Sequence, residues 1–177
     1  MTVSSQATDD QRQYLTFLLA GEEYAISILR VKEIIGYDTL TMVPKTPTWV
    51  RGVINLRGNV VPVVDLAIRF GLADRPVSKT TCIIIVEWQL QSEAMMIGLI
   101  ADAVSQVMDI AAGEILDVPA FGTHVRMDYL SGMAQLGKKF ALLLDIDKIL
   151  SANEMLDLHD AASETTGTDK ATLAKHG

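Results

Sequence analysis

The chain has 177 residues and a formal net charge of −7 at pH 7, and 49% of its residues are hydrophobic. A chain of this length and composition can bury a substantial core and forms one domain or two small ones. Acidic residues outnumber basic ones 22 to 15 and aromatic residues make up only 6%, which argues against nucleic acid as the main partner, because phosphate contacts need Lys and Arg and base stacking needs aromatic rings.

The first elements in chain order are short and of β type. Residues 1–12 are polar, so we expect a flexible tail there; they lack the basic region and apolar block of a secretory signal. Residues 14–19 and 24–28 flank the turn Gly21-Glu22-Glu23, which predicts a hairpin. From 28 to 35 the apolar spacing fits a helical turn or a strand, and we expect one turn followed by a strand.

Residues 52–64 predict a second hairpin, with Arg57-Gly58-Asn59 as its turn. Gly and Asn readily adopt the positive φ that a tight turn requires. Pro62 has no backbone N–H, so its strand should have an open edge or a bulge at that point. Asp65 predicts the N-cap of a short helix over residues 66–70.

The second half opens with two further predicted strands, 82–86 and 94–100, after a polar connector over 73–79. A loop is expected at 117–126, and the next hairpin turns at Gly137-Lys138-Lys139. This order of elements again indicates short strands separated by tight turns.

The end of the chain carries helix signals. Asp145 predicts another helix N-cap. The sequence Ser151-Ala152-Asn153-Glu154 has the form of a capping box, so we expect a C-terminal helix that extends to about Ala162. Residues 163–177 are rich in Thr, Ser, Gly and Lys, and we expect a flexible tail there.

The chain contains an internal repeat. Residues 49–66 align without a gap on residues 129–146, 80 positions later. Looser matches precede this block at offsets of 73 and 75. The aligned pairs are Gly52/Gly132, Leu56/Leu136, Asp65/Asp145, Ile26/Leu99, Val31/Val104, Ile34/Val107 and Val43-Pro44/Val118-Pro119. Short strands in two similar sets predict two small five-stranded β-barrels related by a pseudo-twofold axis, with a cleft between them lined by equivalent strands.

The sequence offers little for catalysis or metal binding. His124, His159 and His176 do not lie near other ligands at a metal-binding spacing. Asp65 and Asp145 are the best candidates for paired catalytic carboxylates, but helix capping is the simpler role. Cys82 lies in an apolar run, which predicts an inert core thiol. Asp102 interrupts an apolar stretch, where a cap or turn role is expected. We therefore expect no catalytic residue, no metal and no cofactor.

The compartment follows from two further observations. A single cysteine excludes an intrachain disulfide and fits a reducing compartment. No apolar run approaches the roughly 18 residues of a membrane span. We expect a cytoplasmic protein.

Two charged residues stand among apolar neighbours, Glu33 beside Ile34 and Ile35, and Arg57 in a hairpin turn. Each has a simple alternative role on a solvated surface. We hypothesise that they form an ion pair, because each can satisfy the charge of the other.

Four blocks, EEYAISILRVKEIIGYD, PTWVRGVINLRGNVVPVVDL, IGLIADAVSQVM and YLSGMAQLGKKFALLLDIDKIL, resemble the CheW-like family of bacterial chemotaxis coupling proteins in order and spacing. The likeness covers residues 13–160. It implies a mainly β fold of two pseudo-symmetric SH3-like five-stranded barrels with short helices and a C-terminal helix. We expect one domain over 13–160, with intertwined barrels over roughly 20–80 and 81–150 plus the N-terminal strand.

The resemblance also implies partners. Members of the family link the cytoplasmic tip of methyl-accepting chemotaxis receptors to the regulatory domain of the histidine kinase CheA, and copies meet in array rings. It implies association with membrane receptors through protein contacts, without membrane insertion or nucleic acid. The implied contact positions line a groove between the barrels; they are Val31, Glu33, Gly52, Asn55, Leu56, Arg57, Gly58, Ile97, Gly98 and Val107.

Gly52 and Gly98 would permit close approach of a receptor helix, although a turn or bulge role explains a glycine equally well. On the first interpretation Gly52→Asp abolishes receptor binding and leaves the barrels folded. The competing classes are a nucleic-acid-binding barrel and an enzyme that uses Asp65 and Asp145.

Overall fold

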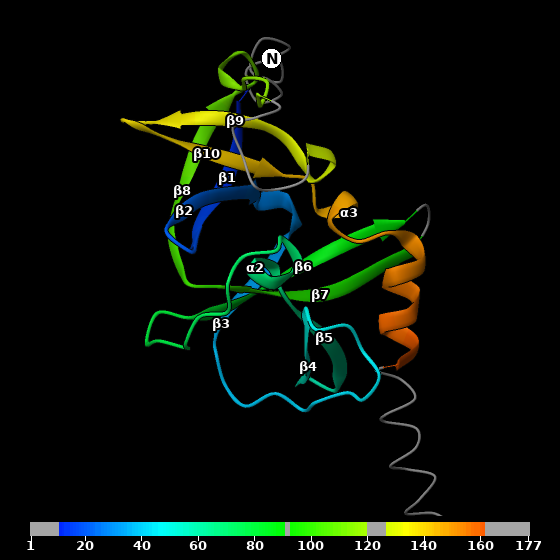
Figure 1. Ribbon diagram of the computed structural model, residues 1–177. Helices are drawn as coiled ribbons and strands as arrows, with labels where there is room; N and C mark the ends of the chain where they lie inside the picture. Colours follow the sequence, from blue (N-terminus) through cyan, green and yellow to red (C-terminus); the bar gives the residue numbers. More distant parts are fainter. Residues whose placement is uncertain (1–10, 91–92, 120–126, 162–177) are drawn as a thin grey trace, which may run out of the picture.

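Apolar and β-branched residues form two five-stranded sheets in a computed structural model that describes residues 11–90, 93–119 and 127–161 (Figure 1). The strands are β1 (Gln11–Leu19), β2 (Glu22–Ser27), β3 (Val31–Gly36), β4 (Val50–Leu56), β5 (Asn59–Asp65), β6 (Cys82–Leu90), β7 (Glu93–Ala101), β8 (Ala103–Ala111), β9 (Leu130–Leu136) and β10 (Lys139–Leu144). The short helical elements are η1 (Ile28–Arg30), α2 (Leu66–Arg69), η2 (Ala112–Glu114), η3 (Met127–Tyr129), α3 (Ile146–Ile149) and a helix over 152–161, the last among the described residues, which we call the final helix. The mainly β fold predicted from the sequence is confirmed.

The two sheets have equivalent topologies. Their strand orders are β8-β1-β2-β10-β9 and β3-β6-β7-β5-β4, and each contains one parallel pair, β2 with β10 and β5 with β7. The parallel registers agree with the repeat, since Leu143 pairs with Ala25 and Val63 with Gly98. The duplication read from the sequence therefore extends to every strand.

The strands are exchanged between the two halves of the chain. The first sheet combines β1 and β2 with β8, β9 and β10, whereas β3, β4 and β5 join β6 and β7 in the second sheet. The expected division into barrels over 20–80 and 81–150 therefore does not follow the sheets. The first hairpin of each copy, β1–β2 or β6–β7, completes the sheet formed by the last three strands of the other copy. Local sequence does not encode this choice of pairing partner.

Isolated bridges close each sheet. Thr41, after β3, exchanges backbone hydrogen bonds of 3.0 and 2.8 Å with Val53 on β4, and Leu116, after β8, bonds Met133 on β9 at 2.8 and 2.9 Å. Each bridge joins one outer strand to the segment that follows the opposite outer strand of the same sheet, so a strand edge is covered in both places. We call the closed sheets barrel 1 (β1, β2, β8, β9, β10) and barrel 2 (β3 to β7).

Pro62 lies where the sequence predicted an open edge. Val53, its register partner on β4, directs both of its backbone groups to Thr41, and the pairing of β5 with β7 begins only at Val63. A residue without an N–H therefore costs no ladder hydrogen bond at this point.

The helix caps form as predicted. The Asp65 carboxylate accepts from the N–H groups of Ala67 and Ile68, and that of Asp145 accepts from the N–H of Asp147. The capping box also forms, with Glu154 N to Ser151 Oγ at 3.1 Å and Ser151 N to Glu154 Oε1 at 2.9 Å. The final helix is described to residue 161, and the expected tails over 1–12 and 163–177 lie almost wholly outside the described residues.

The largest hydrophobic cluster lies between the barrels. Phe17 and Tyr24 of barrel 1 share it with Ile84 and Leu99 of barrel 2, and all four side chains are at most 2% exposed. Two smaller clusters fill the individual barrels. The space between the barrels, expected from the sequence as an apolar cleft, is therefore a packed core that holds them together.

Arg69 on α2 contacts residues from both copies of the repeat. Its guanidinium lies over the rings of Trp49 and Tyr129, 4.6 and 5.6 Å from their centroids, and these two rings occupy equivalent positions in the repeat. The same group donates to the carbonyl of Ile149 at 3.2 Å and to Glu154 at 2.9 Å. One side chain thus connects both copies and the final helix.

Candidate protein-docking site

The hypothesised ion pair between Glu33 and Arg57 is present. Arg57 Nη2 donates to Glu33 Oε2 at 2.8 Å, from the tip of the β4–β5 hairpin to β3. The Arg57 side chain is 77% exposed and that of Glu33 only 23%. Glu33 Oε1 is buried, and it has no hydrogen-bond partner among the described residues. The pair fixes the hairpin tip against β3 and leaves most of the guanidinium open to a partner.

The hairpin tip is built by local sequence. Arg57 and Gly58 have φ of +53° and +87°, and Asn55 Oδ1 accepts from the N–H of Gly58 at 2.9 Å. These left-handed residues suit a two-residue turn between twisted strands. Asn55, Arg57 and Gly58 are exposed, while Leu56 is half-buried against the interior of barrel 2.

Gly52 has an architectural role. Its φ is +147°, and a Cβ at this position would lie 2.4 Å from the carbonyl oxygen of Thr41. Its repeat partner Gly132 has φ +156° and would meet Ile115 at 2.5 Å. Both glycines allow the closing segment to approach the strand. The expectation that Gly52→Asp leaves the barrels folded is therefore replaced, because the β-carbon alone cannot fit.

The other expected contact positions are distributed over the molecule. Val31 is partly buried at the start of β3 against the inter-barrel core. Ile97 is 2% exposed, and Gly98 is buried with its α-carbon facing Ile83 and Val63 inside barrel 2. Val107 is 49% exposed, but it lies on β8 of barrel 1. The structure brings Glu33 and the hairpin tip together and keeps Ile97 and Gly98 in the interior.

Exposed apolar side chains near β3 were missing from the expected set. Leu29 on η1 is 81% exposed and Ile34 on β3 is 44% exposed. Ile34 is the repeat equivalent of Val107, so a similar apolar group is exposed on each barrel. The repeat alignment contained this signal, but sequence alone does not say which face of a strand meets solvent.

Ion pairs also form at the start of β3 and on the preceding η1. Lys32 Nζ lies 2.7 Å from Glu87 Oε2, and hydrogen bonds from Lys32 and Gln89 lower the pKa of Glu87. Arg30 forms a two-point contact with Asp147, with its Nη1 at 3.0 Å and its Nη2 in a shorter contact. Burial acts to raise the pKa of Asp147, but the bonds from Arg30 and from the N–H of Gln89 outweigh it, and the pKa is lowered.

The carboxylates considered for catalysis have structural roles. Asp65 caps α2 and also accepts from Arg51 Nε at 3.0 Å, and Asp145 caps α3. Asp102 accepts from Arg75 at 2.6–2.9 Å and from the N–H of Ala20, which ties β7 to the β1–β2 turn. Burial, with a smaller contribution from Asp102, raises the pKa of the Cys82 thiol, as expected for an inert core residue.

In the part of the chain that the structure describes, the His, Cys, Asp and Glu side chains form no group of three that could hold a metal ion. The helices of the same part include none with the length and hydropathy to cross a membrane.

The chain is similar to known proteins along most of its length. It matches the model of the CheW-like domain over residues 13–154. It is 37% identical over 155 residues to the chemotaxis protein CheW of Klebsiella aerogenes, covering 87% of this chain and 91% of that protein. It is 34% identical over 149 residues to the chemotaxis protein CheW of Bacillus subtilis, with coverages of 84% and 89%.

A solved structure shows the same architecture. The scaffolding protein TtCheW from Thermoanaerobacter tengcongensis superposes with a TM-score of 0.73 at 34% identity, over 81% of this chain and 90% of that one. The duplicated barrels, the family match over most of the chain and these relatives lead to one conclusion: this chain belongs to the CheW-like domain family.

Proposed function

We propose that this chain is a non-catalytic adaptor that couples the cytoplasmic tip of methyl-accepting chemotaxis receptors to the regulatory domain of the histidine kinase CheA. The observation that carries the proposal is the likeness over most of both chains to a protein described as a scaffold. Its action is cytoplasmic, at receptor arrays, where further copies join the same assembly.

The receptor-facing surface is proposed around the Glu33–Arg57 pair. The hairpin tip presents an arginine that is held by one bond to Glu33 and follows the half-buried Leu56, and the residue after Glu33, Ile34, is exposed on the other face of β3. A cation with an apolar border is suited to a partner helix that presents both a carboxylate and aliphatic side chains. Val31, Asn55, Gly58 and Val107 complete the proposed contact set.

The buried members of the set have an indirect role in this proposal. Gly52 permits the Thr41 segment to close the barrel, and Ile97 and Gly98 pack on either face of β7. They keep the docking surface in one shape, which lowers the entropic cost of binding.

Reconstitution tests the function. Purified chain, a soluble receptor fragment and CheA are combined, and kinase activity is measured with and without the receptor ligand. We expect receptor-dependent control of the kinase only when all three proteins are present. Equal control without this chain, or turnover of a small molecule by the chain alone, would disprove an adaptor role.

A further inference from the structure

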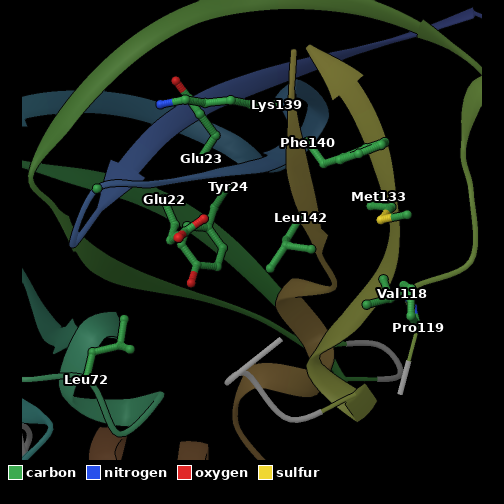
Figure 2. Close-up of a pocket in the computed structure, with 11 residues that line it drawn as sticks. Glu22, Glu23, Tyr24, Leu72, Val118, Pro119, Met133, Lys139, Phe140 and Leu142 are labelled. Atoms are coloured by element: carbon green, nitrogen blue, oxygen red, sulfur yellow. The ribbon is translucent and has the colours of Figure 1, made fainter. Parts of the chain in front are cut away.

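Barrel 1 carries an open apolar groove. Tyr24, Val118, Met133, Phe140 and Leu142 line a pocket of ≈ 600 Å³ beside β2, β9 and β10 (Figure 2). Phe140 is 43% exposed in it. We call this pocket the barrel 1 groove. An exposed aromatic ring among aliphatic side chains is typical of a protein contact surface.

The repeat identifies the equivalent place on barrel 2. The aligned pairs, barrel 1 first, are Tyr24/Ile97, Val118/Val43, Met133/Val53, Phe140/Val60 and Leu142/Pro62. On barrel 2 this place is covered. Ala161 and Val60 pack against Val43 and Val53, which are each 8% exposed. Barrel 2 therefore shows what fills such a groove.

The cover on barrel 2 is the final helix of the chain, 152–161, which runs down beside barrel 2 in Figure 1. Met155 and Leu158 are at most 4% exposed and belong to the same cluster as Ile97. With Ala161 they recur every three residues and form one apolar face. The groove of this fold thus accepts an amphipathic helix.

The two copies diverge just after their short helices. After α3 the chain continues into the final helix, but after α2 it leaves the groove at Leu72, the repeat equivalent of Ala152. The connector that follows is fixed by Arg75, which bonds Asp102 at 2.6–2.9 Å, and its residues after Leu72 do not line the pocket. Leu72 remains at the groove wall, where the missing helix would begin (Figure 2).

The groove also carries charge. Glu22 and Glu23 line one side and Lys139 lies at the rim (Figure 2). Burial and the charge of Glu22 raise the pKa of Tyr24 to about 12, so the phenol stays neutral. An occupant with basic residues beside its apolar face complements this wall, whereas the acidic final helix of the chain itself does not.

We propose that the barrel 1 groove is a second docking site, which binds an amphipathic helix of a partner protein with apolar residues every third position and lysine or arginine facing Glu22 and Glu23. The site lies on the other barrel from the Glu33–Arg57 pair, and it does not depend on the proposed function.

The probe is a synthetic peptide of residues 151–162 that carries E154K, D157K and D160K, titrated into the full-length chain and followed by NMR. We expect saturable shifts at Met133, Phe140 and Leu142. Phe140→Asp should weaken binding about tenfold or more, since burial of its ring is lost. Leu29→Asp, at an 81% exposed position on η1, serves as the control and should bind normally.

A second pair of variants covers the case in which Phe140→Asp does not fold. The double variant Glu22→Lys/Glu23→Lys should bind the lysine-substituted peptide more weakly, and the unmodified acidic peptide more strongly, than the wild type does. Equal binding of both peptides to both proteins would overturn the proposal. Peptide-induced shifts at Val43 and Val53 rather than at the groove would also overturn it. So would cross-links from Phe140 to residues 162–177, or a dimer seen by sedimentation that the Phe140→Asp substitution dissociates.

Discussion

Arg57 and Glu33, 24 positions apart, are joined by a hydrogen bond of 2.8 Å across the end of barrel 2. The bond connects the tip of the β4–β5 hairpin to β3, and β3 and β4 are the two outer strands of this sheet. Its two partners differ in environment, since the arginine is mostly exposed and one carboxylate oxygen is buried. That asymmetry suits a group that is positioned by the fold and used by a partner.

Replacement of Arg57 by Ala should affect binding more than folding. An exposed ion pair contributes about 0–1 kcal/mol, so urea unfolding should change by less than about 1 kcal/mol, and a double-mutant cycle with Glu33→Ala should show a coupling of the same size. Recovery of the complex of this chain with the receptor fragment and CheA in pull-downs should fall. Lys138→Ala, at the exposed tip of the equivalent hairpin, is the control; a similar loss with that variant would contradict a specific role for Arg57.

Gly52→Ala should destabilise the protein by about 2 kcal/mol or more, because the new β-carbon meets a backbone oxygen and the φ is unfavourable. Gly132→Ala should behave in the same way. Gly36→Ala is the control, since no atom lies within 4 Å of the added carbon, and it should change stability by at most about 0.5 kcal/mol. Chemical denaturation measures all three. Wild-type stability in Gly52→Ala would refute the close-approach argument.

Arg69→Ala removes the bonds to Ile149 and Glu154 and the contacts with two rings. We expect a loss of about 2 kcal/mol, the scale of hydrogen bonds from a charged group with cation–π contacts. Arg69→Lys should recover only part of it, because an ammonium does not reproduce the planar geometry. Unfolding followed by the fluorescence of Trp49 and Trp88 measures the change. An effect no larger than that of Arg57→Ala would show that the junction does not depend on this side chain.

The Arg30–Asp147 contact should make the free energy of unfolding depend on pH in the acidic range. The pKa of Asp147 is lowered in the folded protein, below an unfolded value of about 4. Its contribution is therefore complete above the unfolded pKa and is lost as pH falls through the folded pKa. The stability difference between wild type and Asp147→Asn should shrink as the pH falls from 7 to 3. Asp157→Asn, at an exposed position, is the control. If the stability difference between wild type and Asp147→Asn stays constant with pH, this linkage is ruled out.

Features that depend on neighbouring residues were predictable from sequence. The hairpin at Arg57-Gly58, the caps at Asp65 and Asp145, the capping box at Ser151 and the open edge at Pro62 all form. Each depends on conformational preferences or hydrogen bonds within a few residues, so its signal is contained in a short segment. The Glu33–Arg57 pair was also inferred, because two isolated charges in apolar surroundings each require a partner.

The sequence by itself determined the duplication, the β class and the family, because these are carried by periodicity and by the spacing of motifs. Only the tertiary structure decided that the copies exchange strands, that a core fills the space between barrels, and that Ile97 and Gly98 lie inside. The final helix covers one barrel and leaves the groove of the other open. The physical reason is that backbone pairing and burial are settled between distant segments, where the free energy of many weak contacts selects one arrangement that no single segment specifies.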